Sequence, residues 1–152
     1  MAFNMDKNGA PLYWQHQCTL PAKPRGFHLI TENMRQAIAN MPPIQTGLIN
    51  FFLQHTSASL TLSENTCPDV ALDLETHFNK LIPDDNRLYR HTFEGEDDMP
   101  AHLKNVMLGA SLVIPLYEGC MALGQWQGIL LCEHRNSAPP RRIIITAHGV
   151  GA

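Results

Sequence analysis

Histidine is the residue type with the clearest potential for chemistry in this chain, which has eight of them among 152 residues. Neighbouring histidines are at least eleven residues apart, so a site that uses several of them must be assembled by folding. Three of them, His55, His91 and His102, have hydroxyl or acidic residues close by in sequence. Three neutral imidazoles can hold a divalent ion with one position open, or they can exchange protons with a small phosphorylated or otherwise anionic molecule. The sequence alone leaves both chemistries open.

His55 ends the most apolar stretch of the chain, residues 47–55, and is followed at once by a polar loop. A stretch that is nearly all apolar predicts a strand covered on both faces. Such a strand end is a place where a rigid scaffold presents a functional side chain. Glu64 and Asn65 end the next predicted strand, so they would lie near His55 if the two strands were neighbours. Asp69 would add a carboxylate, although its position in the first turn of a helix is also explained by the helix dipole.

His91 and His102 lie on either side of the acidic segment 94–98. His102 follows Pro100 in the first turn of a predicted helix, where the positive end of the helix dipole disfavours an imidazolium. A neutral imidazole there can bind a metal or accept a proton. A carboxylate of the acidic segment could orient an imidazole. The alternative interpretation is a surface histidine beside a solvated loop.

Arginines and a Trp-Gln pair complete the candidate residues. Arg90, Arg135 or Arg142 could hold an anionic substrate through charge-assisted hydrogen bonds. Trp126 and Gln127 follow a turn and begin a predicted strand. Tryptophan at such a position is typical of a core, whereas glutamine within a strand must face solvent, a pocket or a partner chain.

The elements that must position these residues follow from hydrophobic periodicity and from prolines and glycines. Consecutive strands joined by short turns pair antiparallel. We therefore expect an α+β fold, a mostly antiparallel sheet or sandwich with about three helices, formed by residues 12–152 after a flexible N-terminal segment, 1–11. The predicted strands are 12–20, 47–55, 59–63, 112–116, 121–123, 126–134 and 143–148, and the predicted helices are 31–41, 68–82 and 100–108.

Composition excludes several classes of function. The apolar stretches are far shorter than the roughly 20 residues that cross a bilayer, so no membrane association is expected. The first residues lack a basic leader followed by an apolar core, which predicts a cytoplasmic location. Eleven basic against fourteen acidic residues give a net charge of −3, so a nucleic acid is not an expected partner.

Several separated segments, in this order along the chain, resemble the YjbQ family. The similarity covers about residues 13–148, and the agreement of several motifs makes it more specific than any one of them. The segments are 54–65 (QHTSASLTLSEN), Pro68-Asp69-Val70, Tyr89-Arg90-His91, Ala101-His102-Leu103-Lys104, Leu108-Gly109 with Ser111-Leu112, and Gly124-Gln125-Trp126-Gln127-Gly128-Ile129.

The resemblance implies a compact α+β fold, assembly as a homotrimer, and a site between or near subunits. It also implies the activity of a secondary thiamine-phosphate synthase, which joins a pyrimidine diphosphate to a thiazole phosphate. Two positions depart from the family pattern, because Asp98 and Ser63 stand where asparagine is more common. The family's functional residues match His55, His91, His102, Glu64, Asn65, Trp126 and Gln127.

The leading hypothesis is thus a cytoplasmic, trimeric transferase acting on a small phosphorylated molecule, with zinc or magnesium as a possible cofactor. Two alternatives remain open: a non-catalytic binder of a phosphorylated metabolite or metal ion, and a metal-assisted hydrolase. We expect proton handling by Glu64. The expected metal ligands are His55, His91 and His102, the expected catalytic residues are His55, Glu64, Asn65 and Asp69, and the expected substrate-binding residues are Arg90, Trp126 and Gln127.

Overall fold

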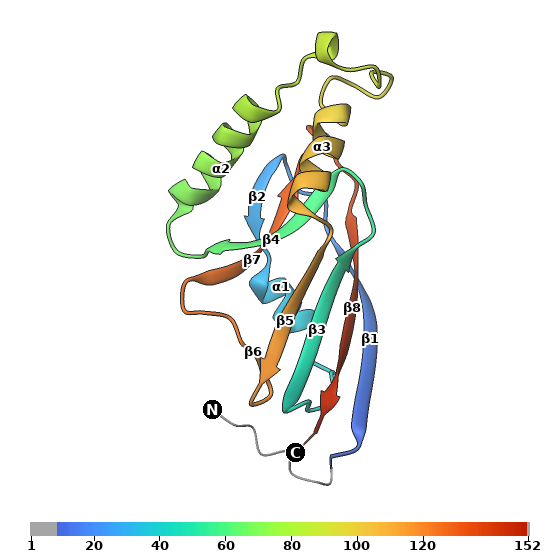
Figure 1. Ribbon diagram of the computed structural model, residues 1–152, viewed down its shortest axis with the longest axis vertical. Helices are drawn as coiled ribbons and strands as arrows, with labels where there is room; N and C mark the ends of the chain where they lie inside the picture. Colours follow the sequence, from blue (N-terminus) through green and yellow to red (C-terminus); the bar gives the residue numbers. More distant parts are fainter. Residues whose placement is uncertain (1–8, 152) are drawn as a thin grey trace.

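The computed structural model describes residues 9–151, which form two antiparallel sheets and three α-helices (Figure 1). The predicted α+β class is therefore confirmed. Most of the expected N-terminal segment 1–11 lies outside the described residues, and Pro11 already belongs to the first strand. The five-stranded sheet has the order β1 (Pro11–Leu20), β8 (Arg141–Val150), β3 (Thr46–Leu53), β5 (Ser111–Tyr117), β6 (Cys120–Met121), and the three-stranded sheet the order β2 (Gly26–Leu29), β7 (Gln127–Glu133), β4 (Ala58–Glu64).

The main hydrophobic core lies between the two sheets. Alternate side chains of each strand point into it, as the two-residue period of a strand requires. Ile49, Phe51 and Leu53 enter from β3 and are at most 1% exposed. Ile129 and Leu131 enter from β7, on the opposite side of the core. The alternation of apolar and polar residues along the strands thus gives each sheet one apolar face, and these two faces pack together as a sandwich.

Two helices cover the outer face of the three-stranded sheet. Helix α2 (Pro68–Leu81) packs on β2, and helix α3 (Asp98–Leu108) packs on β4. Between them lies a short 3-10 turn, η1 (Asn86–Leu88), and the remaining helix, α1 (Thr31–Ala37), connects β2 with β3. Strand β7 is consequently buried on both faces. The second, smaller core under α2 and α3 contains Phe27, Leu130 and Cys132, packed against Ala71, Leu74, Phe78 and Leu108.

Three details of the sequence prediction are wrong. Strand β2 was not expected, because it is only four residues long and follows two prolines. Helix α1 ends at Ala37, four residues before the predicted end. Strand β3 is covered on one face only: Leu48 and Phe52, on its other face, are 41% and 48% exposed. The outer face of β3 therefore exposes apolar side chains to solvent in this chain.

His55 follows β3 and Glu64 ends β4, and these two strands are not neighbours because they belong to different sheets. Strand β4 pairs with β7, with Ala58 opposite Glu133 and Glu64 opposite Gln127. The six residue steps between the two ends of β4 correspond to roughly 20 Å at about 3.3 Å per residue. The fold thus separates the candidate residues into a group near the start of β4 and a group at its end.

A buried histidine follows β7 and gives the fold a predictable response to pH. His134 is 1% exposed, its Nε2 lies 2.9 Å from the hydroxyl of Ser59, and its Nδ1 finds no hydrogen-bond partner within residues 9–151. Burial, with the nearby charges of Lys104, Arg25 and Arg141, lowers the pKa of His134 to about 3. The imidazole is therefore neutral in the folded chain at neutral pH.

This histidine should make the folded state less stable in acid. Below the ordinary histidine pKa of about 6.5, the unfolded chain binds a proton that the folded chain does not, until the pH reaches about 3. Stability should therefore fall as the pH falls through this window, by up to about 1.4 kcal/mol per pH unit from this group. Urea unfolding between pH 7 and pH 4 measures the slope. The slope should become shallower in His134→Gln and stay unchanged in a variant of the exposed His148, and an equal slope in His134→Gln would contradict the assignment.

No helix within residues 9–151 combines the length and the apolar composition that crossing a bilayer requires.

Candidate functional site

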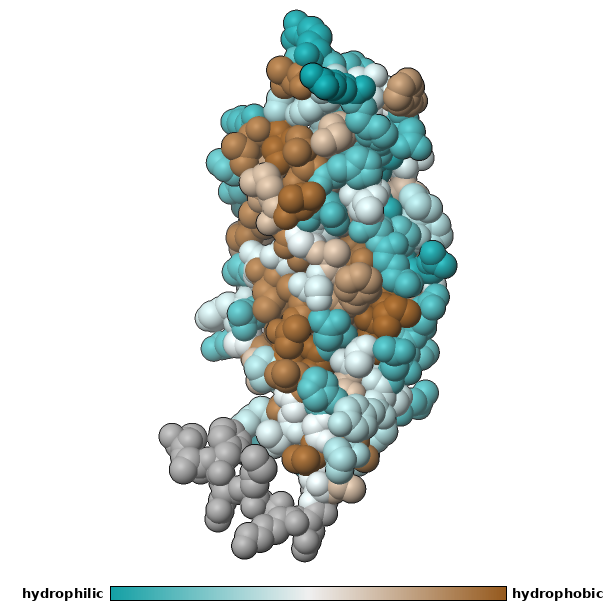
Figure 2. Space-filling model, turned by 45° about the vertical axis from the view of Figure 1, so that its right-hand side comes forward, coloured by the Kyte–Doolittle hydropathy of each residue, from teal (hydrophilic) through white to brown (hydrophobic). Residues whose placement is uncertain are grey.

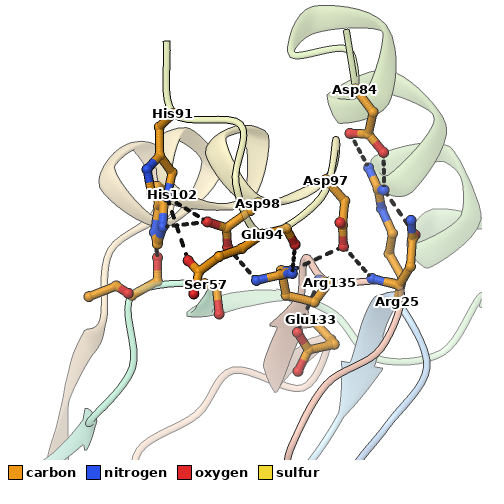
Figure 3. A network of polar contacts seen from close by, with 12 residues as sticks. Arg25, Ser57, Asp84, His91, Glu94, Asp97, Asp98, His102, Glu133 and Arg135 are labelled. Atoms are coloured by element: carbon orange, nitrogen blue, oxygen red, sulfur yellow. Dashed lines mark hydrogen bonds and ion pairs between the residues drawn. The ribbon is translucent and has the colours of Figure 1, made fainter. Parts of the chain in front are cut away.

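Two imidazoles and a carboxylate meet where helix α3 begins (Figure 3). Asp98 and His102 are four residues apart on α3, so they lie on the same face of the helix, one turn apart. His91 reaches the same point from the loop that precedes the helix. Its Nε2 lies 2.7 Å from Oδ2 of Asp98, and Nε2 of His102 lies 3.3 Å from the same oxygen. Within residues 9–151, these three side chains form the one cluster whose potential ligand atoms all lie within 4.8 Å of one another.

A backbone contact decides which nitrogen of His102 faces this cluster. Nδ1 of His102 lies 2.8 Å from the carbonyl oxygen of Thr56, which can only accept a hydrogen bond. Nδ1 must therefore carry the hydrogen, and Nε2 of the neutral ring presents its lone pair to Asp98. Metal-binding histidines commonly have this arrangement, with the second ring nitrogen donating to a carbonyl or carboxylate.

Asp98 is held as a carboxylate. Its side chain is 2% exposed, and its second oxygen, Oδ1, accepts a hydrogen bond from the guanidinium of Arg135. Burial opposes the negative charge, but the hydrogen bond from His91 and the charge of Arg135 outweigh it, so the pKa of Asp98 lies below its ordinary value. The imidazoles remain accessible, since the side chains of His91 and His102 are 42% and 30% exposed. A dissolved ion or small molecule can therefore reach the cluster.

The donor set fits a divalent metal ion. Tetrahedral coordination with bonds of 2.0–2.1 Å separates the ligand atoms by about 3.3 Å. The distance between Asp98 and His102 already has this value, whereas His91 and Asp98 would have to separate by roughly 0.6 Å as the hydrogen between them leaves. Three protein ligands leave one coordination position for water or substrate.

The ring of His55 does not join this cluster. Its Nε2 accepts a hydrogen bond of 2.9 Å from the backbone N–H of Arg142, and its Nδ1 lies 3.3 Å from Nη1 of Arg141. Burial, followed by the charges of Arg141 and Arg142, lowers the pKa of His55, so the ring stays neutral. The loop that follows His55 does reach the cluster, through the carbonyl group of Thr56.

Glu64 and Asn65 lie in the group at the other end of β4, where they make local hydrogen bonds. Oε2 of Glu64 accepts the backbone N–H groups of Thr66 at 3.0 Å and Cys67 at 2.8 Å, just before α2 begins. Nδ2 of Asn65 donates to two carbonyl groups of the turn that leads into β7, at 3.2 Å each. In this chain both side chains order the backbone at the junction of β4, β7 and α2.

The remaining predicted residues are exposed. Asp69 lies in the first turn of α2, and Arg90 lies in the loop before His91. Trp126 is 58% exposed, contrary to the core position that is typical of this residue. Gln127 is exposed at the start of β7, and its Oε1 accepts the backbone N–H of Gly124 at 2.8 Å. The chain therefore presents an exposed indole about one strand length away from the histidine cluster.

Sequence reasoning missed the support behind the cluster. The sequence offers Arg135 as a residue that could hold an anionic substrate, but its guanidinium forms ion pairs with Asp97 and Asp98. Glu133 and Arg141 form a buried ion pair, which the sequence analysis does not predict. The available signal was the charge of Glu133 directly after the apolar run 129–132, since a charged residue in such a strand needs a buried partner.

Comparisons with known proteins agree on one family. The family model described as "UPF0047 protein YjbQ-like" matches residues 16–150. A UPF0047 protein YjbQ from Salmonella typhimurium is 51% identical over 138 residues, which are 91% of this chain and 99% of the relative.

Solved structures have the same fold. A YbjQ-like protein of unknown function from Sulfolobus solfataricus has a TM-score of 0.82 at 23% identity, over 92% of this chain and 99% of that one. An uncharacterised YjbQ/UPF0047 protein from Clostridium acetobutylicum has a TM-score of 0.74 at 29% identity, over 86% and 97%. Given the family match along nearly its whole length and the close bacterial relative, the chain belongs to the YjbQ (UPF0047) family.

Proposed function

We propose that this protein is a metal-dependent transferase for small phosphorylated molecules, of the thiamine-phosphate-synthase type, with the ion bound by His91, Asp98 and His102. The observation that carries this proposal is the short distance between Nε2 of His102 and Oδ2 of Asp98. When the ring is neutral, a lone pair on Nε2 faces a carboxylate oxygen at 3.3 Å, and neither atom has a hydrogen to share. A cation between them would satisfy both.

The donor set favours zinc over magnesium. Magnesium prefers six oxygen ligands and keeps several waters, whereas zinc is commonly bound by imidazole nitrogens together with one carboxylate. His91 and His102 supply two nitrogens, and Asp98 supplies the oxygen. A bound zinc ion would offer a positive charge to the phosphate groups of a substrate.

For the transferase reaction, the residues of the cluster would hold the diphosphate of the pyrimidine substrate as pyrophosphate departs. Arg90, exposed in the loop before His91, would pair with a phosphate group. Glu64 and Trp126 are too distant within one chain, so they would act in the same site only if another subunit brought them to the cluster.

This requirement supports a homotrimer with sites between subunits. The outer face of the five-stranded sheet carries Leu48, Phe52 and Val113, which are 41%, 48% and 57% exposed. Figure 2, in which the right-hand side of Figure 1 is turned forward, shows apolar side chains gathered along the long axis of the molecule. Apolar patches of this kind are typical of protein interfaces.

Light scattering after size-exclusion chromatography tests the trimer. The wild-type chain should have three times the mass of one 17.0 kDa chain, and Phe52→Asp should shift it toward the monomer. Leu72→Asp is the matched control, because Leu72 is 65% exposed on α2, which packs on the three-stranded sheet rather than on the five-stranded one. A wild-type monomer at micromolar concentration would contradict the shared site.

The transferase activity is tested by following the product and pyrophosphate with purified protein, with and without added Zn²⁺. The variant His55→Ala/His91→Ala/His102→Ala should lose the activity. The control His16→Ala/His77→Ala replaces two exposed histidines, on β1 and α2, and should keep it. Full activity in the triple variant would overturn the proposal.

A non-catalytic binder of a phosphorylated metabolite is the second candidate. It is favoured by Glu64, whose carboxylate oxygen already accepts two backbone N–H groups and is therefore poorly placed to move a proton. Calorimetry with phosphorylated ligands, beside the turnover assay, separates the two functions. Tight binding without turnover would identify the binder.

A further inference from the structure

A buried carboxylate lies behind the histidine cluster at the end of β7. Glu133 is fully buried, and it accepts two hydrogen bonds from the guanidinium of Arg141, at 2.7 Å from Nε and 2.6 Å from Nη2. The Oε1 atom of Glu133 also accepts the backbone N–H of Arg135, at 3.1 Å. One carboxylate therefore fixes the side chain of one arginine and the backbone of another.

The first arginine leads to His102. Nη2 of Arg141 donates to the hydroxyl of Ser57 at 3.1 Å and to its carbonyl oxygen at 3.3 Å. Ser57 follows Thr56, whose carbonyl oxygen lies 2.8 Å from Nδ1 of His102. The loop after His55 is thus held in place by Arg141, and this loop determines which nitrogen of His102 faces the cluster.

The second arginine leads to Asp98. The guanidinium of Arg135 bonds Oδ1 of Asp98, donates to Asp97 at 3.0 Å, and donates to the carbonyl oxygen of Glu94 at 2.8 Å. Figure 3 shows Arg135 between Asp97 and Asp98, with Glu133 beneath it. Because Arg135 occupies Oδ1, the other oxygen of Asp98 is the one directed to His91 and His102.

We infer that Glu133, Arg135 and Arg141 are positioning residues of the metal site, with each arginine fixing one ligand atom. The inference rests on the proposed metal site, and it adds residues that act through the ligands Asp98 and His102. If these three residues had only a structural role, replacing them would change the stability of the end of β7 and nothing else. A positioning role also controls the ligand field of the ion and the tautomer of His102.

Cobalt(II) is the probe for the ligand field, since its visible spectrum reports the geometry of a zinc site. Arg135→Lys keeps the positive charge but cannot span Asp97 and Asp98. It should bind Co²⁺ about 10 to 100-fold more weakly and with an altered spectrum. Arg25→Lys is the matched control, because Arg25 pairs with Glu75 and Asp84 but contacts none of the three ligands. Wild-type affinity and spectrum in Arg135→Lys would overturn the inference.

Nitrogen-15 NMR of the metal-free protein at pH 8 tests whether Arg141 positions His102. The neutral His102 of the wild-type chain should carry its hydrogen on Nδ1, and Arg141→Lys should mix the two tautomers. Ser57→Ala is a milder variant, which removes only the hydroxyl contact and should shift the mixture in the same direction. An unchanged tautomer in both variants would contradict the inference. Failure of the wild-type chain to bind Co²⁺ would instead refute the proposed metal site, and the NMR result would still decide whether Arg141 positions His102.

Discussion

A His102→Ala variant is expected to bind Zn²⁺ at least about 100-fold more weakly than the wild-type chain. Loss of a partner outside the coordination shell typically costs 10 to 100-fold in affinity, so loss of a ligand itself should cost more. His102 provides the lone pair of Nε2, and its orientation is fixed by Thr56. Competition with a chromophoric chelator at pH 7.5 measures the affinity.

Two controls make this experiment specific. His148→Ala removes an exposed histidine of β8 and should leave the affinity unchanged. His55→Ala should change it much less than His102→Ala, because the ring of His55 bonds Arg142 rather than the cluster. If His55→Ala were the more damaging variant, the ion would be bound elsewhere than the geometry indicates.

A Glu133→Ala variant is expected to be destabilised by about 3–5 kcal/mol. Removing one partner of a buried ion pair leaves the other charge unpaired in the interior, which is the costly outcome. The side chains of Glu133 and Arg141 are 0% and 2% exposed, so water cannot replace the lost partner. Urea unfolding measures the free energy of unfolding, and Asp85→Ala, which breaks the surface pair with Arg87, should have a far smaller effect.

A double variant separates the loss of the pair from the loss of one partner. Glu133→Leu/Arg141→Met replaces both charges with apolar side chains of similar size and should recover much of the stability lost in Glu133→Ala. The same variant should not recover metal affinity, because it lacks the contacts to Ser57 and to the backbone of Arg135. A change below about 1 kcal/mol in Glu133→Ala would contradict the buried pair.

The sequence predicts a helix or strand well where residues within that element determine it. Helix α2 begins at Pro68 as expected, because proline suits the first helical turn and an apolar stripe follows. Strand β1 follows from strict alternation. The pairing of strands is different, because it depends on contacts between distant segments. Nothing near β3 or β4 in sequence indicates that they belong to separate sheets.

The candidate site could be predicted in part. The sequence indicates His91 and His102 on either side of the acidic segment 94–98, but the predicted helix begins at residue 100, whereas α3 begins at Asp98 and so includes this carboxylate. The sequence does not reveal that the ring of His55 lies outside the cluster. This ring bonds a backbone N–H, and its neighbour Thr56 contacts His102 through a backbone carbonyl. Periodicity and residue type carry no information about such backbone contacts. The support from Arg135 also depends on the end of β7 lying beside α3.

X-ray absorption at the zinc edge, on protein loaded with one equivalent of Zn²⁺, tests the cluster of His91, Asp98 and His102 most directly. We expect nitrogen and oxygen neighbours at about 2.0–2.1 Å, with the outer scattering of two imidazole rings. That imidazole signal should disappear in His91→Ala/His102→Ala. A spectrum without imidazole scattering, or one that is the same in the double variant, would contradict the proposed site.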